Sequence, residues 1–249
     1  MHPTARVLDR DGDAAERRPD AGPIEARWLG RIDYRVAWDL QRRLAAERAD
    51  DLIADQLLLL EHPAVLTLGR QAEESHVLAS PKELRRREIQ VLRVERGGEV
   101  TYHGPGQLVA YPILKLSPRG LLIKPLVRAL EGAMSDTCAA LGVDAGRRDG
   151  HPGCWCDVGT PEPHKIGALG LRVERGVTYH GIALNVNVDL VDFDLIDACG
   201  EPGTVSTSIA NELGRTAEAP STEAVGRAAT IFARALAGRL GAPLEGDLP

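Results

Sequence analysis

Lys165 and Cys199 are the two residues whose types and surroundings could perform covalent chemistry together. A cysteine attacks as a thiolate, which requires partial exposure and a cationic or basic neighbour. Cys199 lies in the glycine-rich sequence DACGEPG, which would expose the thiol and offer backbone N–H groups to an oxyanion. Lys165 precedes the sequence IGALG, whose burial would favour a neutral amine that can act as a base. We therefore predict that a base and a nucleophile meet here; a buried inert cysteine and a strand-edge lysine reaching into water are the alternatives.

A second stretch, Arg96–Gln107, contains four glycines and a proline in the sequence RGGEVTYHGPGQ. Such a backbone turns sharply or approaches a ligand closely. His103 within it could donate to a substrate carbonyl or orient the thiol, or it could hydrogen-bond only to the turn; the same alternatives hold for His180. The sequence RVERGGEVTYHG nearly repeats downstream as RVERGVTYHG, which ends at Gly181. Two similar edges facing one cavity are our hypothesis, and chance similarity of strand ends is the alternative.

Metal and phosphate sites are less well supported by the sequence. His151, Cys154, Cys156 and His164 could hold zinc, but their spacing differs from that of the usual zinc knuckles, so incidental thiols are the better interpretation. No glycine-rich phosphate-binding motif with its lysine is present. The run of Asp192, Asp194 and Asp197 lacks calcium-loop spacing and fits turn and helix capping better. We predict neither a metal nor a cofactor.

Bulk composition limits the class of protein. The 249 residues have a formal charge of −6, which argues against nucleic-acid binding. No apolar run has the length of a membrane span, and no export signal precedes the four cysteines, so we expect a cytoplasmic protein with free thiols. The charged segment 1–22 is expected to be a disordered tail. Residues 23–245 are expected to form one catalytic domain.

Alternating strand and helix patterns predict an α/β protein. We expect helices that begin after Asp33, at Ser80–Pro81, over 124–141 and over 222–240. We expect strands over 23–29, 56–60, 64–68, 90–94 and 108–116, and a pair of strands within 165–189. The segment 144–164 is expected to be a long connection with one short strand.

Three motifs together resemble the octanoyltransferase family, also called lipoyl(octanoyl) transferases, over about residues 25–215. The motifs are RGGEVTYHGPGQLVAYP, HKIGALGLRVERGVTYHGIALNVNVDL and the ACG loop. The resemblance implies an acyl thioester on Cys199 and a Lys165 that lowers the pKa of that thiol. It also implies substrate contacts from Arg96, Gly97, Gly98, Glu99, Val100, Thr101, Tyr102, His103, Ala168, Leu169, Gly170, Gly181, Ile182 and Ala183.

The implied fold is that of the biotin and lipoate protein ligases, which is related to class II synthetases: a single α+β domain with a large mixed sheet, a smaller sheet and flanking helices. The implied reaction moves octanoyl from acyl carrier protein to a lysine of lipoyl domains, in 2-oxo acid dehydrogenase E2 subunits and the glycine cleavage H protein, as the first step of lipoate biosynthesis. Thioester exchange is nearly neutral in energy and amide formation from a thioester is downhill, so neither ATP nor a metal is needed. We expect a monomer that binds neither nucleic acid nor membranes.

Three rival functions remain open at this point. One is an ATP-dependent lipoate or biotin ligase of the same fold, although the G-R-G-R-R-G type of loop found in biotin ligases is absent. Another is a Cys–His hydrolase of acyl thioesters, built from Cys199 with His103 or His180. The last is a non-catalytic module that only binds lipoyl domains.

Overall fold

Capping residues set the ends of the main helices in the computed structural model, which describes residues 22–197, 203–215 and 219–249. Helix α1 (Tyr34–Ala49) begins after Asp33, whose carboxylate accepts from the Arg35 amide at 2.8 Å. Helix α5 (Thr222–Leu240) begins after Ser221, which caps Ala224, and ends at Gly241 in a left-handed conformation. Each cap side chain accepts from a backbone amide that has no partner within the helix, which stabilises the first turn. Both predicted helices are therefore confirmed.

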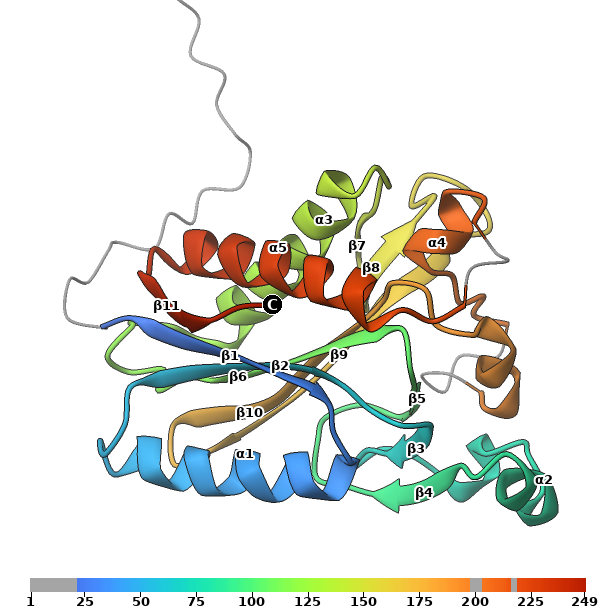
Figure 1. Cartoon of the computed structure of the whole chain (residues 1–249), viewed down its shortest axis with the longest axis horizontal. Coiled ribbons are helices and arrows are strands. Elements are labelled where there is room, and N and C mark those ends of the chain that lie inside the picture. Colours follow the sequence, from blue (N-terminus) through green and yellow to red (C-terminus); the bar gives the residue numbers. More distant parts are fainter. Residues whose placement is uncertain (1–21, 198–202, 216–218) are drawn as a thin grey trace, which may run out of the picture.

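Eight of the described strands form a large mixed sheet in the order β11-β1-β2-β6-β10-β9-β8-β7. They are β1 (Ile24–Arg31), β2 (Asp55–Glu61), β6 (Gln107–Ile113), β7 (Gly146–Arg148), β8 (His151–Cys156), β9 (His164–Glu174), β10 (Val177–Asn185) and β11 (Leu244–Asp247). Helix α1 covers one face, while α3 (Ile123–Ala140) and α5 cover the other (Figure 1). Each face therefore has its own apolar core.

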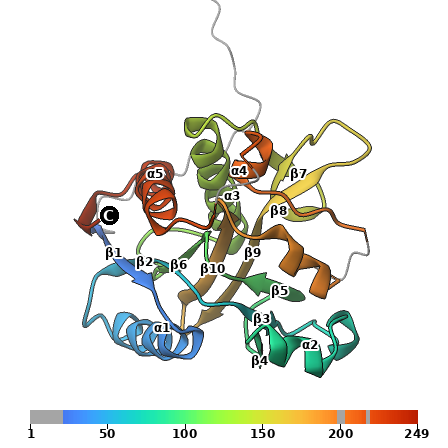
Figure 2. The same cartoon turned by 45° about the vertical axis from the view of Figure 1, so that its right-hand side comes forward.

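A smaller sheet has the order β4-β3-β5. It is built from β3 (Val65–Leu68), β4 (Gln90–Arg93) and β5 (Val100–His103). It lies beside one end of the large sheet, near the short helix α2 (Pro81–Arg86), as Figures 1 and 2 both show. The 3-10 helices η1 (Glu74–His76) and η2 (Leu190–Leu195) and the short helix α4 (Ile209–Glu212) complete the described elements. The predicted architecture of a large sheet, a smaller sheet and flanking helices is confirmed.

One local expectation needs revision. The segment 144–164 contains two strands, β7 and β8, rather than the single short strand that we predicted. Its glycines, prolines and polar residues hide the alternation by which a strand is usually recognised. The strands expected over 56–60 and 64–68 are present as β2 and β3, and they belong to different sheets. The expected tail lies outside the described residues, apart from Gly22.

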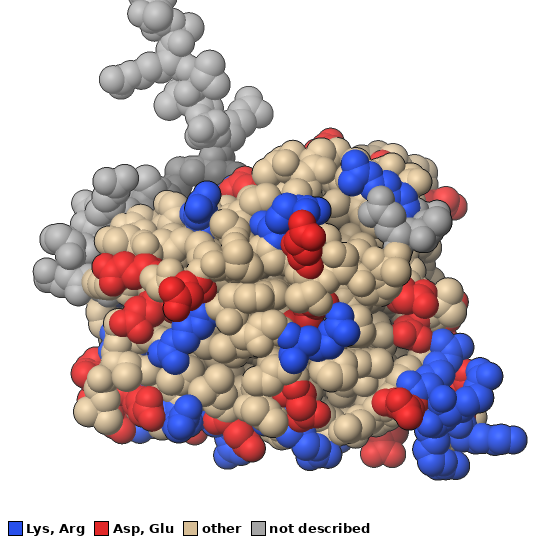
Figure 3. Space-filling view, in the orientation of Figure 1, with Lys and Arg blue, Asp and Glu red and all other residues tan. Residues whose placement is uncertain are grey.

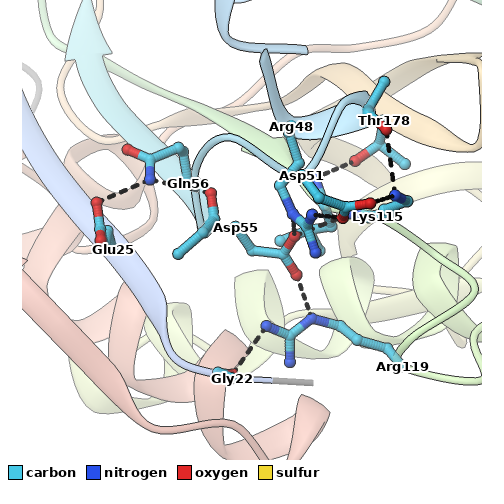
Figure 4. A network of polar contacts seen from close by, with 12 residues as sticks. Gly22, Glu25, Arg48, Asp51, Asp55, Gln56, Lys115, Arg119 and Thr178 are labelled. Carbon is cyan, nitrogen blue, oxygen red and sulfur yellow. Dashed lines mark hydrogen bonds and ion pairs between the residues drawn. The ribbon is translucent and has the colours of Figure 1, made fainter. Parts of the chain in front are cut away.

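The buried carboxylate of Asp55, at the start of β2 in the large sheet, is the centre of a polar network (Figure 4). Asp55, at the start of β2, accepts from Nε of Arg48 at 2.6 Å and from Nε of Arg119 at 2.5 Å. It also accepts from the backbone amide of Lys115 at 3.0 Å. Because both guanidinium groups are buried too, the end of α1, β2 and the segment after β6 depend on this one carboxylate.

Among the described helices, none is both long and apolar enough to cross a bilayer.

Candidate active site

A cavity of about 220 Å³ lies between β9–β10 and the smaller sheet. Two cross-strand pairs of small residues, Ala168 with Ala183 and Gly170 with Gly181, lie along it. The short side chains of Ala168 and Ala183 leave open space in the cavity, whereas a Cβ on Gly170 or Gly181 would collide with the backbone of a neighbouring segment. Of the residues implied by the motifs, the cavity is lined by Arg96, Gly98, Glu99, Val100, Thr101, His103, Ala168, Leu169, Gly170, Gly181, Ile182 and Ala183. We call this cavity the slot.

Gly97 and Tyr102 are absent from the described lining of the slot. The amide of Gly97 donates to the carbonyl oxygen of Leu171 at 3.0 Å, so it attaches the glycine-rich stretch to β9. A Cβ on Gly170 would come within 2.7 Å of the Gly97 oxygen, and a Cβ on Gly97 would come within 3.1 Å of the Leu171 oxygen, so the close approach of the two segments favours glycine at both positions. Tyr102 turns away because neighbouring strand residues face opposite sides, and its hydroxyl donates to Asp192 at 2.7 Å.

Arg96 lines the slot as a buried cation held by the smaller sheet. Its Nη2 donates to the backbone oxygen of Thr67 at 2.6 Å, and its Nε donates to the hydroxyl of the same residue at 3.2 Å. These bonds fix the direction of the guanidinium group. The buried charge is thus a structural part of the slot wall.

Lys165 lies at the end of the slot formed by β8 and the start of β9. Its side chain is largely buried, and its Nζ lies 5.0 Å from the centre of the Trp155 ring. Its backbone amide donates to the Val205 oxygen at 2.8 Å, and its backbone oxygen accepts from the Thr207 amide at 3.0 Å. The base that we predicted therefore lies in the slot, beside the segment that follows position 203.

Cys199 lies outside the described residues, so its predicted meeting with Lys165 stays a prediction. The described residues on both sides of it are attached to the slot. On one side, the Asp197 amide donates to the backbone oxygen of His76 at 2.9 Å. Nδ1 of His76 lies 3.3 Å from the carboxylate of Glu99, which lines the slot. On the other side, Val205 pairs with Lys165.

Aromatic and imidazole rings gather at the other end of the slot. Tyr34, Tyr111 and His180 line it there together with His103, and His62 packs behind them. Burial lowers the pKa of His62 and of His180 to about 4, and it lowers that of His103 well below the ordinary value. The slot therefore ends in neutral polar rings.

Hydrogen bonding fixes the tautomer of His62. Its Nδ1 lies 2.7 Å from the backbone oxygen of Ile32, which can only accept. Its Nε2 must then accept from the hydroxyl of Tyr111, 2.8 Å away. Tyr111 lies in the first motif but was not among the predicted contacts. Tyr34 and Trp155 also line the slot, and they come from elements that carry no motif.

The two near-repeats do face one cavity. His103 ends β5 in the first copy, and His180 lies on β10 in the second; both line the slot. This confirms the hypothesis of two similar edges.

Sequence comparisons agree with this arrangement. The model of the lipoyl protein ligase A/B catalytic domain matches residues 33–229. An octanoyltransferase of Corynebacterium efficiens is 46% identical over 226 residues, which is 90% of this chain and 86% of the relative. An octanoyltransferase of Mycolicibacterium gilvum is 44% identical, covering 92% of each chain. This chain belongs to the octanoyltransferase family.

Solved structures show the same fold for this family member. A bipartite lipoate protein ligase from Thermoplasma acidophilum superposes with a TM-score of 0.60 at 16% identity, covering 91% of this chain and 86% of the other. LipL1 of P. falciparum superposes with a TM-score of 0.65 at 10% identity, covering 90% and 66%. The predicted likeness to lipoate ligases is therefore confirmed. As an octanoyltransferase, the protein is an acyltransferase enzyme.

The remaining three cysteines of this octanoyltransferase are buried free thiols. A hydrogen bond to Cys154, together with burial, raises the pKa of Cys138, and burial raises that of Cys156 to about 12. The thiols of Cys138 and Cys156 therefore stay protonated at neutral pH and are poor nucleophiles. The zinc site considered above, with His151, Cys154, Cys156 and His164, does not form in the described residues. The group there whose ligand atoms lie close enough to hold a metal is Asp157, His164 and Glu212, which includes neither cysteine of β8.

Proposed function

We propose that this enzyme takes octanoyl from acyl carrier protein onto Cys199 and passes it to a lysine of lipoyl-domain proteins. The observation that carries the proposal is the place of Lys165. It lies buried at one end of an apolar slot, and its backbone is bonded to the segment that closely follows Cys199. A base and a thiol beside an acyl-sized slot are the parts that acyl transfer requires.

In the first half-reaction, Lys165 takes the thiol proton and the Cys199 sulfur bonds to the octanoyl carbonyl carbon. The carbon–sulfur bond to the carrier then breaks, and the carrier thiolate leaves with the proton that Lys165 held. In the second half-reaction, a neutral acceptor amine forms the carbon–nitrogen bond and the bond to Cys199 breaks. Lys165 accepts the proton that the amine loses and returns it to the Cys199 thiolate.

The slot suits a medium-length, uncharged chain. Its volume of about 220 Å³ is small, and Ala168, Ala183 and Leu169 give it apolar walls. An apolar chain gains free energy as it leaves water for such a site. Tyr34 and Tyr111 line the end of the slot away from Lys165, where their rings would limit the length of the chain.

Both protein partners follow from the family and the proposed reaction. Lipoyl-domain proteins are the acceptors that family membership indicates.

For the donor, α2 offers a cationic surface with Lys82, Arg85 and Arg86 exposed. This surface appears as a blue cluster at the lower right of Figure 3. Arg87 joins this helix to η2, shortly before Cys199, through Asp192 at 2.7 Å. A cationic surface in a chain of net charge −6 favours an acidic carrier. The monomeric state and cytoplasmic location stay predictions.

The imidazoles of the slot argue against a Cys–His hydrolase. A pKa of about 4 makes His180 a weak base at neutral pH, and His103 is shifted in the same direction. Neither imidazole is then a good base for the thiol. Transfer to an amine therefore fits the slot better than hydrolysis by an imidazole-activated pair.

A transfer assay separates this function from its rivals. The enzyme is mixed with octanoyl carrier protein and a lipoyl domain, without ATP, and the mass of the lipoyl domain is followed. We expect the domain to gain one octanoyl group, and no gain from free octanoate with ATP. Modification only with octanoate and ATP would indicate a ligase, free octanoate would indicate a hydrolase, and binding without any acyl product would indicate a binding module; each contradicts the proposal.

A further inference from the structure

His180 has an unusual backbone for its position within a strand. Its φ of 56° lies in the left-handed region, which non-glycine residues rarely adopt. The ring of His180 stacks on that of its neighbour Tyr179, with centres 5.1 Å apart and an angle of 29° between the planes. Neighbouring side chains of a regular strand point to opposite faces. The left-handed backbone therefore turns the imidazole into the slot, where it also meets the edge of Tyr111.

Both ring nitrogens of His180 are buried without a hydrogen-bond partner among the described residues, and the side chain is only 1% exposed. The backbone amide is satisfied separately, by the side-chain oxygen of Gln41 at 2.8 Å. Buried polar atoms are nearly always paired, because an unpaired one loses the hydrogen bonds it had with water. Strained backbone and unpaired nitrogens at one residue point to a ligand atom that this structure lacks.

The position of His180 along the slot indicates which part of the ligand would pair with its imidazole. His180 pairs with Leu171, which follows Lys165 by six positions on β9. Lys165 marks the end where the acyl carbonyl reacts, so His180 lies toward the far end of the acyl chain. This step rests on the proposed function, which places the thioester beside Lys165.

We propose that His180 is a specificity-determining residue that hydrogen-bonds a hydroxyl group near the ω-end of the acyl chain, so that the slot takes ω-hydroxyacyl groups of medium length. A neutral imidazole offers one donor and one acceptor, and a hydroxyl can pair with either. A hydroxyl carries no charge and needs no counter-ion in the slot. Against a methyl end, the same imidazole stays unpaired.

The test compares ω-hydroxyacyl and methyl-ended thioesters on one enzyme preparation. Octanoyl, 8-hydroxyoctanoyl, decanoyl and 10-hydroxydecanoyl carrier proteins are used, and kcat/KM for acyl transfer gives a hydroxyl-to-methyl ratio at each chain length. At one of the two lengths the ratio is expected to be at least one in the wild type and to fall about tenfold in His180→Leu. Because both members of a ratio share one preparation, partial unfolding of a variant cancels.

Two further variants keep the test decisive. His180→Asn keeps a donor and an acceptor and tolerates a left-handed backbone, so it is expected to retain most of the wild-type ratio. His180→Gly suits the backbone but lacks the imidazole, and it replaces His180→Leu if that variant does not fold. A ratio that is the same in the wild type and in His180→Leu or His180→Gly at both chain lengths overturns this inference, while octanoyl transfer itself remains intact. Loss of octanoyl transfer by the wild type would instead overturn the proposed function.

Discussion

The backbone oxygen of Lys165 accepts a hydrogen bond from the amide of Thr207 at 3.0 Å. Together with the bond from Lys165 to Val205, it fixes the segment that follows Cys199 against the start of β9. Both bonds use main-chain atoms, so replacing the Lys165 side chain leaves them in place. The role of the amine can therefore be tested without loss of the strand pairing.

Replacing Lys165 by alanine is expected to slow acylation of the enzyme by a factor on the order of 10² to 10⁴, the usual contribution of a general base. Lys165→Arg is expected to be as slow, because a guanidinium stays protonated. Single-turnover mixing with octanoyl carrier protein measures the rate. Lys124→Ala, which removes an exposed lysine at the start of α3, is the matched control and should match the wild type. An acylation rate of Lys165→Ala within about twofold of the wild type would remove this residue from the base role.

Acid is expected to destabilise the fold through its buried histidines. Burial holds the pKa of His62 at about 4, against 6.5 for an exposed imidazole, so the unfolded chain binds the proton more readily between these values. This contribution to stability is complete above about pH 6.5 and is lost as the pH falls toward about 4. At about pH 5 the loss is roughly 2 kcal/mol for each such residue, and His180 adds a similar amount.

Urea unfolding at about pH 7.5 and about pH 5 measures this loss. His62→Gln, which keeps a donor and an acceptor, should reduce the difference between the two free energies of unfolding. Val191→Ala, which changes an exposed side chain without a titratable group, is the control and should leave the difference unchanged. Equal pH dependence in His62→Gln and the wild type would contradict the prediction.

Removing the Asp55 carboxylate is expected to destabilise the protein strongly. Asp55→Ala leaves the buried guanidinium groups of Arg48 and Arg119 without their shared partner, at a cost of about 3–5 kcal/mol. Glu223→Ala breaks an exposed ion pair with Arg227 and should cost below about 1 kcal/mol. Chemical denaturation compares the two variants, and a similar small loss in both would show that the network of Figure 4 contributes little.

Much of the fold could be predicted because its signals are local. The Asp33 cap and the helix over 222–240, whose apolar residues recur at helical spacing, were predicted and are both present. Only one of the two strands in 144–164 was predicted, because β7 is three residues long and β8, HPGCWC, alternates poorly and has a proline and a glycine after its first residue. The turn after β2 gives no information about which sheet β3 joins, since that choice depends on distant partners.

The slot was only partly predictable for the same reason. His103 and Ala168 lie in motifs, so the resemblance indicated them. Tyr34 starts α1 and Trp155 lies inside β8, both outside the motifs, and only the tertiary fold brings them to the slot. Tyr111 lies in the first motif, but nothing in the motif indicates that its side chain lines the slot. The direction of the His180 ring depends on its positive φ angle, which no sequence pattern predicts.

Charge reversal on α2 is expected to weaken recognition of the donor. In the double variant Arg85→Glu/Arg86→Glu, KM for octanoyl carrier protein should rise about tenfold at low salt with kcat unchanged, because the charges act on encounter. The difference should shrink as salt is added. Arg234→Glu makes the same kind of change on an exposed residue of α5 and is the control. An unchanged KM, or a rise that salt does not affect, would exclude α2 as the docking surface.

The acyl-enzyme on Cys199 is the centre of this account, and intact mass after mixing with octanoyl carrier protein, before any acceptor is added, tests it most directly. The wild type should gain the mass of one octanoyl group. Cys199→Ser should gain none, and Cys156→Ala, which removes a buried thiol with a raised pKa, should gain as much as the wild type. A wild-type enzyme without added mass, or a Cys199→Ser variant that is acylated equally, would contradict the account.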